Sequence, residues 1–318
     1  MVADALMTGG RIIGWGTALP EKVLTNAELS TMMDTNDEWI TERTGIKRRH
    51  VGGSTATLSI ESARHAIAMS GIDPASIDGL VLSTTTPDRT VPATSATVQN
   101  ARGLRCGAFD LNAACSGFVY AYVVAHGLLA IGAKRLLVIG TDTLSRITDW
   151  SDRGTAILFA DGSGACVVES TPDAGQLLGW DIDADGSAED LLYCEVGGHL
   201  HMDGKEVFRR AVRIMVDSAE KSLAASGTSV SDIAMVVPHQ ANIRIISAAC
   251  ERLGIPMSKT ALALAETGNT SSASIPLAWF AAADEGRLTP GDLVLLVGFG
   301  AGMTAASAVV RWTGAGKP

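Results

Sequence analysis

The chain alternates between short apolar runs rich in β-branched residues and longer segments in which apolar residues recur with a helical period. This alternation is typical of an α/β protein built on a mixed or parallel sheet. The clearest helix is predicted over residues 205–225, where one stripe of the helical wheel is apolar. Residues 117–133 are almost entirely apolar but shorter than the roughly 20 residues that span a bilayer, so they predict a buried core helix. The predicted strands are residues 11–15, 79–84, 107–113, 135–141, 164–169, 233–238, 293–299 and 305–312.

Segments of the first half of the chain match segments of the second half, which predicts a duplicated architecture. The aligned segments are residues 70–82 with 226–238 and 111–118 with 267–274, both at an offset of 156, and 134–140 with 292–298 after a slip of two residues. We infer two similar α/β halves packed face to face, residues 1–175 and residues 176–318. The junction near residues 170–190 lacks a Pro/Gly/Ser-rich linker, so the halves are expected to share one core.

Composition narrows the class of protein. The 318 residues are 47% apolar and 19% charged, which excludes a disordered chain. The formal net charge of −9 argues against a nucleic-acid partner, and it requires any acidic protein partner to find a local basic patch. Five cysteines without paired spacing, and an opening segment that lacks the pattern of a signal peptide, predict a cytoplasmic protein that is not a membrane protein.

Cys115 is the candidate nucleophile. It lies where an apolar strand ends in small residues and a long helix begins at about Ser116. The positive end of the helix dipole and nearby backbone N–H groups are expected to lower the pKa of the thiol and favour the thiolate. The other four cysteines have no such context and are interpreted as buried and inert.

His239 and Asn269 are the candidate partners of Cys115. His239 follows an apolar strand at the corresponding strand end of the second half, so the repeat places it on the same side of the sheet as Cys115. Asn269 lies in the segment that aligns with the Cys115 turn. Taken alone, His239 would be a structural histidine and Asn269 a turn or helix-cap residue.

The glycine-rich segment 298–302 is followed by a strand pattern and lacks the GxGxxG spacing, which excludes a dinucleotide loop. A tight glycine loop between strands can instead bring backbone N–H groups to a bound oxyanion. His199 and His201 carry metal-ligating groups, yet a third ligand at a usual spacing is lacking, so no metal site is predicted.

The chain resembles the beta-ketoacyl-acyl-carrier-protein synthase III family of the thiolase superfamily. The motifs that carry the resemblance are AACSGF at Cys115, PHQAN at His239, GNTSSASIP at Asn269, GFGAG at 298–302, and the segments 34–50, 151–165 and 202–212. The resemblance covers nearly the whole chain. It implies a thiolase-like duplicated fold, with two pseudo-symmetric α/β halves and mixed five-stranded sheets in a layered αβαβα arrangement.

The resemblance also implies the reaction that initiates fatty acid biosynthesis. Cys115 would take an acyl group from acyl-CoA, and malonyl-acyl carrier protein would then lose CO2 and attack the acyl-enzyme in a Claisen condensation. His239 and Asn269 would stabilise the malonyl thioester oxygen as two donors. The acyl oxyanion would lie between the N–H groups of Cys115 and Ala301. The family's active-site loop corresponds to Phe299, Gly300 and Ala301, and Phe299 would favour departure of the carboxylate by desolvation. No cofactor is implied, because the CoA thioester is a substrate.

Correspondence with the family assigns further residues. Trp39 and Arg153 would lie on either side of the CoA adenine and Arg43 by its phosphates. Val91 would reach across the interface of a homodimer to the floor of the acyl pocket, where a valine leaves room for primers longer or more branched than acetyl. The entrance and pantetheine tunnel correspond to Thr35, Gly204, Ala241 and Asn242, and the carrier-protein docking patch to Arg209, Arg213 and Arg244.

Three alternatives stay open at this point. A starter-unit condensing or acyl-transfer enzyme of polyketide or secondary metabolism would use the same acyl-enzyme. A papain-like cysteine hydrolase also has Cys, His and Asn in chain order, but its fold lacks the two-fold α/β repeat. A non-catalytic CoA-binding subunit would be expected to have lost the nucleophile.

Overall fold

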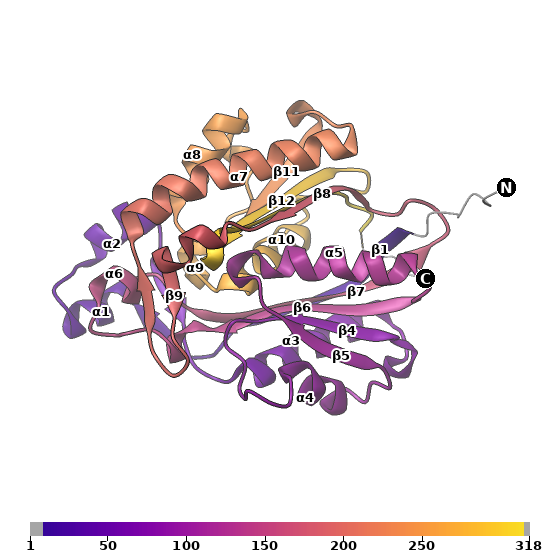
Figure 1. The fold of residues 1–318 in the computed structure, drawn as a ribbon, viewed down its shortest axis with the longest axis horizontal. Helices are drawn as coiled ribbons and strands as arrows, with labels where there is room; N and C mark the ends of the chain where they lie inside the picture. Colours follow the sequence, from indigo (N-terminus) through magenta and orange to yellow (C-terminus); the bar gives the residue numbers. More distant parts are fainter. Residues whose placement is uncertain (1–8, 315–318) are drawn as a thin grey trace.

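The computed structural model describes residues 9–314, which form five stacked layers (Figure 1). Helices α3 and α4 cover one face of a first sheet, helices α5 and α10 lie between the two sheets, and helices α7 and α8 cover the second sheet. The α-helices are α1 (Asn26–Met32), α2 (Asp37–Thr44), α3 (Thr55–Ser70), α4 (Thr94–Ala101), α5 (Gly117–Ala130), α6 (Arg153–Ala156), α7 (Gly204–Ser226), α8 (Ile243–Leu253), α9 (Leu264–Thr267) and α10 (Ser274–Asp284). The layered α/β class is therefore confirmed.

The first sheet has five strands in the order β1-β7-β6-β4-β5. Strands β4, β5 and β6 run parallel, while β7 is antiparallel to both β6 and β1, so the sheet is mixed. Its strands are β1 (Gly9–Ala18), β4 (Gly79–Ser83), β5 (Gly107–Leu111), β6 (Arg135–Thr143) and β7 (Asp161–Thr171). Each overlaps a strand predicted from the apolar runs, although the boundaries differ by a few residues.

The second sheet has four strands, in the order β11-β12-β13-β8, where five were expected. Its strands are β8 (Leu177–Asp183), β11 (Ile233–Pro238), β12 (Leu293–Gly300) and β13 (Thr304–Arg311); two short pairs, β2 (Val23–Thr25) with β3 (Arg48–His50) and β9 (Leu192–Cys194) with β10 (Leu200–Met202), lie outside both sheets. The fifth position is reduced to a single bridge between Val236 and Thr260. The Gln240 side chain replaces a longer ladder here, because it donates to Ala261 O and accepts from the N–H groups of Ala263 and Leu264.

The two halves repeat each other at an offset that grows along the chain. Gly71 and Gly227 both end a helix in the left-handed conformation, which is the predicted offset of 156 residues. At the Cys115 turn, Ala114 (φ 47°) corresponds to Ser271 (φ 52°), so the alignment there is one residue longer than the sequence match predicts. Asn269 is therefore the structural counterpart of Asn112, a relation that side-chain identity alone did not reveal.

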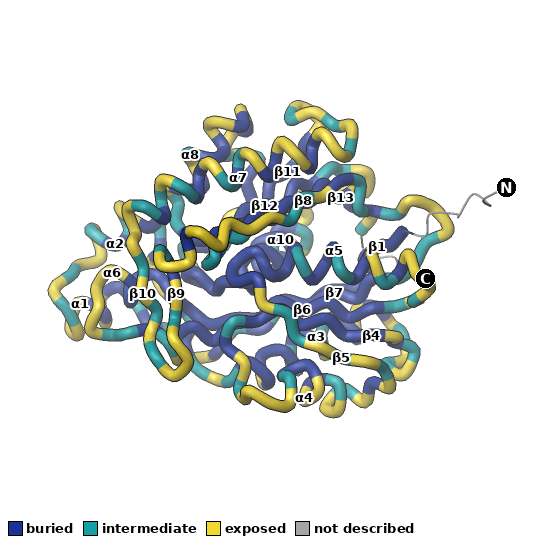
Figure 2. The backbone as a smooth tube through the Cα atoms, viewed as in Figure 1, coloured by how far each residue is buried: buried dark blue, intermediate teal, exposed yellow. Residues whose placement is uncertain are grey.

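The central helices α5 and α10 are packed between the two sheets and are mostly buried (Figure 2). Phe118, Tyr122, Trp279 and Phe280 are fully buried in this layer, with the Trp279 and Phe280 rings stacked at 5.3 Å. The apolar segment at 117–133 is thus a core helix, as predicted. Among residues 9–314, no helix combines the length and the apolar character needed to cross a membrane.

Candidate active site

Cys115 lies in a short 3₁₀ turn, Ala114–Ser116, between strand β5 and helix α5. The turn is tight, since Ala114 has a positive φ and its N–H donates to Asn112 Oδ1 at 3.1 Å. Strand β12 packs directly on the turn, and a Cβ atom at Gly300 would lie only 2.6 Å from the backbone nitrogen of Cys115. Glycine at position 300 is therefore required for this close approach.

His239 follows strand β11 and is held on two sides. Its N–H donates to Val297 O at 2.8 Å, and its Nδ1 is hydrogen-bonded to Ser274 Oγ at 2.6 Å. The Ser274 hydroxyl also accepts from the N–H of Gln240 at 3.2 Å. When this hydroxyl donates to Nδ1, the imidazole proton resides on Nε2 and is free to be donated elsewhere.

Asn269 is fixed by its backbone and by its side-chain oxygen. Its N–H donates to Leu158 O at 3.0 Å, and its carbonyl accepts from Ala160 N at 2.8 Å. Its Oδ1 accepts from Ser271 N at 3.0 Å, the same turn bond that Asn112 makes in the first half. Because the amide oxygen is used in this way, the Asn269 NH2 group remains as the donor.

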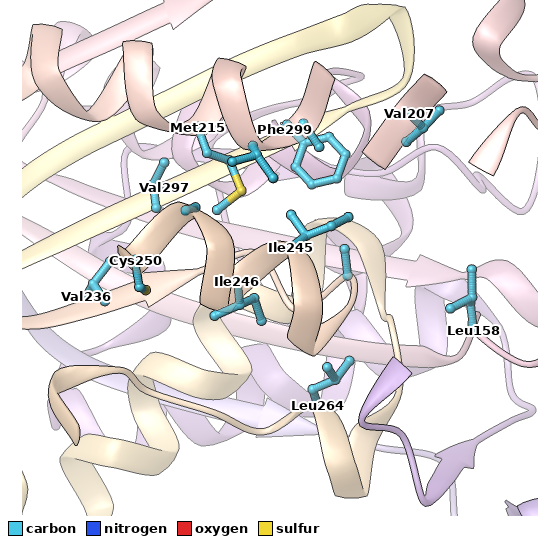
Figure 3. Close-up of a cluster of buried hydrophobic side chains, with 14 of the residues drawn as sticks. Leu158, Val207, Met215, Val236, Ile245, Ile246, Cys250, Leu264, Val297 and Phe299 are labelled. Carbon is cyan, nitrogen blue, oxygen red and sulfur yellow. The ribbon is translucent and has the colours of Figure 1, made fainter. Parts of the chain in front are cut away.

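The three side chains line one cavity, at the meeting of the two halves. The residues around it are Cys115, Leu158, Phe159, Leu192, Met202, Gly204, Val207, Phe208, His239, Ala241, Asn242, Ile245, Asn269, Phe299 and Gly300. Figure 3 shows the apolar wall, where Val207, Ile245 and Phe299 come from α7, α8 and β12. The cavity thus brings together eight of the residues expected from sequence, while Ala301 follows Gly300 without lining it.

Sequence reasoning missed the apolar lining. Leu192 and Met202 come from the small hairpin of β9 and β10, whose three-residue strands are too short to give a periodic signal. Val207 lies on the helical stripe that pattern alone assigns to the core, and Phe208 follows it in α7. A search for apolar residues at the amino-terminal end of α7, close to Gly204, would have found the second pair.

Burial determines the protonation states of the Cys115 thiol and the His239 imidazole. Burial and the charge of Asp142 raise the pKa of the Cys115 thiol to about 12, against a hydrogen bond with Ser271 that lowers it. Burial lowers the pKa of His239 to about 3. The expected lowering of the Cys115 pKa is therefore wrong, because burial outweighs the end of α5. At rest the pair consists of a thiol and a neutral imidazole.

This protonation state predicts slow alkylation of resting Cys115. Between pH 6 and pH 9, the rate constant for iodoacetamide should rise about tenfold per pH unit without a plateau, since the thiolate fraction grows in that proportion below the pKa. The Cys115→Ala protein, measured in parallel, corrects for reaction at the partly exposed Cys106 and Cys194. A plateau near neutral pH would show a low thiol pKa and contradict the structure.

A cationic cluster surrounds Trp39 on helix α2. The guanidinium carbons of Arg43 and Arg153 lie 4.5 Å and 4.7 Å from the centroid of the Trp39 ring. Arg153 is also bonded to the loop before α2, since its guanidinium donates to Asp34 O at 2.7 Å, next to Thr35. An aromatic face with two arginines suits a nucleotide base and its phosphates.

Arginines gather along α7 and α8, where sequence reasoning expected Arg209, Arg213 and Arg244. A surface pocket is lined by Arg209, Arg210, Arg213 and Arg252. Arg244 lies apart from it, with its guanidinium 5.7 Å from the Phe208 ring that lines the cavity. Glu206 engages both Arg209 and Arg210, at 2.6 Å and 2.9 Å. Arg210 and Arg252 were not predicted, because each reads as an ordinary exposed helical residue.

Val91 lies away from the cavity, 79% exposed. Within one chain it therefore does not reach the acyl site. Its predicted place at the pocket floor requires a second chain.

Duplicated α/β halves that enclose a cysteine, a histidine and an asparagine define a thiolase-like enzyme that transfers and condenses acyl groups. Two family models match the chain, 3-oxoacyl-[acyl-carrier-protein (ACP)] synthase III over residues 109–186 and the C-terminal region of the same family over residues 223–312. The chain belongs to the beta-ketoacyl-[acyl-carrier-protein] synthase III family.

Individual relatives support this assignment. The beta-ketoacyl-[acyl-carrier-protein] synthase III of Erythrobacter litoralis is 48% identical, over 96% of this chain and 100% of the relative. The crystal structure of the 3-oxoacyl-[acyl-carrier-protein] synthase III of Aquifex aeolicus superposes with a TM-score of 0.94 at 40% identity, over 96% of this chain and 100% of that one. The priming beta-ketosynthase of the R1128 polyketide biosynthetic pathway superposes with a TM-score of 0.92 at 34% identity, over 97% of both chains.

Proposed function

We propose that this protein condenses a short acyl-CoA primer with malonyl-acyl carrier protein, with loss of CO2, as the initiating step of fatty acid biosynthesis. The observation that carries the proposal is the convergence of Cys115, His239 and Asn269 on one cavity, where each side chain is held by a separate bond or turn. The reaction needs no cofactor beyond the thioester substrates.

The first half-reaction is acyl transfer to Cys115. Because the resting thiol is protonated, its proton leaves as the sulfur attacks the thioester, and it is transferred to the departing CoA sulfur. Backbone N–H groups of Cys115 and Ala301 would bind the oxyanion at the acyl carbon. CoA then leaves as the thiol.

The second half-reaction is decarboxylation of the malonyl thioester. Breaking the bond to the carboxylate leaves an electron pair that is delocalised onto the thioester oxygen as an enolate. The His239 Nε2 proton and the Asn269 NH2 group are donors of the kind that this oxygen requires. The carbanion carbon of the enolate then attacks the acyl-Cys115 carbonyl, and the thiolate is released. Phe299, whose ring packs edge-on against His239 at 5.5 Å, keeps this region apolar and favours loss of the charged carboxylate.

The two substrates are proposed to enter over the arginine-bearing surfaces. Trp39, Arg43 and Arg153 would hold the CoA nucleotide, and Thr35, Gly204, Ala241 and Asn242 would line the path of its pantetheine arm. The acidic carrier protein would dock on Arg209, Arg213 and Arg244, and the pocket of four arginines extends this patch to Arg210 and Arg252.

We also propose that the enzyme is a homodimer. Strand β5 forms the edge of the first sheet and none of its residues is buried (Figure 2). Its Phe109 is 41% exposed. An uncovered edge strand with apolar side chains is suited to pairing with a second copy of itself. Val91 lies just before helix α4, whose first two N–H groups donate to Asp110 of β5, and in the dimer it would enter the partner's acyl pocket. A reducing, cytoplasmic location is proposed from five unpaired cysteines.

The Val91→Phe substitution tests the acyl-pocket role. An added aromatic ring would shorten the pocket, so the ratio of kcat/KM for acetyl-CoA over isobutyryl-CoA should rise about tenfold or more. The Val91→Ile variant, which changes the volume little, is the matched control and should leave the ratio near that of the wild type. Equal primer ratios in Val91→Phe and wild type would exclude Val91 from the pocket.

Priming of a polyketide pathway is the second candidate function, because the R1128 priming ketosynthase shares the fold over nearly the whole chain. The mass of the carrier-protein product separates condensation from simple transfer. When acyl-CoA is supplied together with malonyl carrier protein and holo carrier protein, whose pantetheine thiol is free, condensation yields a beta-ketoacyl carrier protein and CO2, whereas transfer alone yields an acyl carrier protein without CO2 release. Competing fatty-acid and polyketide carrier proteins then distinguish the two pathways by their relative kcat/KM.

A further inference from the structure

Asp142 is a fully buried carboxylate near the active site that the proposed reaction does not use. It lies on strand β6 of the first half. Its Oδ1 accepts four hydrogen bonds from the loop after strand β4, one from Thr84 Oγ1, two from the N–H and Oγ1 of Thr85, and one from Thr86 Oγ1, at 2.7–3.1 Å. Its Oδ2 faces the second half of the molecule.

Oδ2 holds the turn that carries Asn269. It accepts from Ser272 N at 3.0 Å and from Ser272 Oγ at 2.8 Å. The turn can come this close because a glycine stands at position 140, where a Cβ atom would lie 2.4 Å from Ser272 O. The turn is thus held at Asn269 by the backbone of residues 158–160 and at Ser272 by Asp142.

Only a carboxylate satisfies both sides of this position. The N–H groups of Thr85 and Ser272 are backbone donors that cannot rotate away, and they face opposite oxygens of Asp142. An asparagine would have to turn its NH2 group toward one of these two donors, which leaves a buried N–H without an acceptor. A charged acceptor also makes stronger bonds than a neutral one.

We infer that Asp142 is a positioning residue that holds the Asn269 turn of the second half against the first half, and thereby serves decarboxylation more than acyl transfer. This inference rests on the function proposed above. The Cys115 turn has its own supports, since Ala114 N donates to Asn112 and Thr304 Oγ1 donates to Ala113 O at 3.0 Å. The charge of Asp142 also raises the pKa of Cys115, so its removal gives no reason for slower acylation.

The Asp142→Asn variant separates the two half-reactions. Formation of the acyl adduct on Cys115 from acetyl-CoA should stay within about threefold of the wild type, while CO2 release from malonyl carrier protein should fall about 10- to 100-fold, the range expected when an oxyanion donor is misplaced. Equal losses in both half-reactions, or no loss in either, would overturn the inference. The wild type must show both half-reactions; if it does not, the proposed function fails and not this inference.

Asp161→Asn is the matched control. Asp161 is also a fully buried carboxylate, but its donors are Gly52 N, Ser145 N and Ser145 Oγ, none of them in the Asn269 turn. It should lower the melting temperature without changing the ratio of the two half-reactions. If Asp142→Asn does not fold, Ser272→Ala tests the inference instead, because it deletes one hydrogen bond to Asp142 Oδ2. A selective loss of CO2 release of about threefold or more supports the inference, and an unchanged ratio of the two half-reactions overturns it.

Discussion

The Cys115→Ala protein is expected to form no acyl adduct when mixed with acyl-CoA and to lose condensation by about 10³-fold or more, because Cys115 is the one thiol among the residues that line the cavity and none of them carries a hydroxyl. The wild type should gain the mass of one acyl group per chain. Intact-protein mass spectrometry measures both. The substitution removes only a sulfur atom from a buried site, so the fold should be retained with a small loss of stability.

Cys106→Ala is the control for this experiment. Cys106 is partly exposed, so a chemically reactive acyl thioester could label it without catalysis, although burial raises the pKa of its thiol and slows that reaction. Acylation of Cys106→Ala at the wild-type rate would place the adduct elsewhere. An adduct that persists in Cys115→Ala would refute the assignment of the nucleophile.

Removing either oxyanion donor should damage the second half-reaction most. His239→Ala and Asn269→Ala are each expected to slow CO2 release from malonyl carrier protein by about 10²- to 10³-fold, the cost of deleting one preorganised donor. The Asn269→Ala enzyme should still acylate Cys115, since the Cys115 turn does not depend on the Asn269 side chain. Release of labelled CO2 is the measurement.

The Asn269→Asp variant separates the role of the Asn269 NH2 group as a hydrogen-bond donor from the role of its side-chain oxygen in holding the turn. An aspartate can still accept the N–H of Ser271, which keeps the turn bond, but its carboxylate offers no N–H to the enolate. It should therefore be as defective as Asn269→Ala in CO2 release while melting at a temperature near that of the wild type. Wild-type CO2 release by Asn269→Asp would mean that Asn269 acts only through the turn.

Much of the fold could be predicted from the sequence, because the spacing of apolar residues and the glycines that end helices are local signals. All eight predicted strands exist, and the repeat at Gly71 and Gly227 is in the predicted register. Strand β8 was missed because LLGWDID mixes apolar and acidic residues on an edge that is only partly buried. The repeat offset at Asn269 was predicted one residue too short. The two residues that mark the true alignment, Ala114 and Ser271, share a left-handed backbone but differ in residue type.

The sequence predicted which catalytic residues meet at the site, but it did not predict the direction in which the pKa of Cys115 is shifted. The strand-end positions of Cys115 and His239 placed them at one cavity, since matching strand ends of the two halves meet. The pKa of Cys115 was predicted in the wrong direction, because burial depends on how β12 covers the turn, which no local pattern shows. Asp142 escaped notice for the same reason: its partners come from segments up to 130 positions away.

A single-turnover experiment tests the central claim most directly. Wild-type protein is acylated with labelled acyl-CoA, freed of excess substrate and mixed with malonyl carrier protein, and the label on Cys115, the CO2 released and the carrier-protein product are followed together. The account predicts that label leaves Cys115 at the rate at which CO2 appears, and that it is recovered in equal amount as beta-ketoacyl carrier protein. Label that leaves Cys115 as acyl carrier protein or free acid, without CO2, would contradict it.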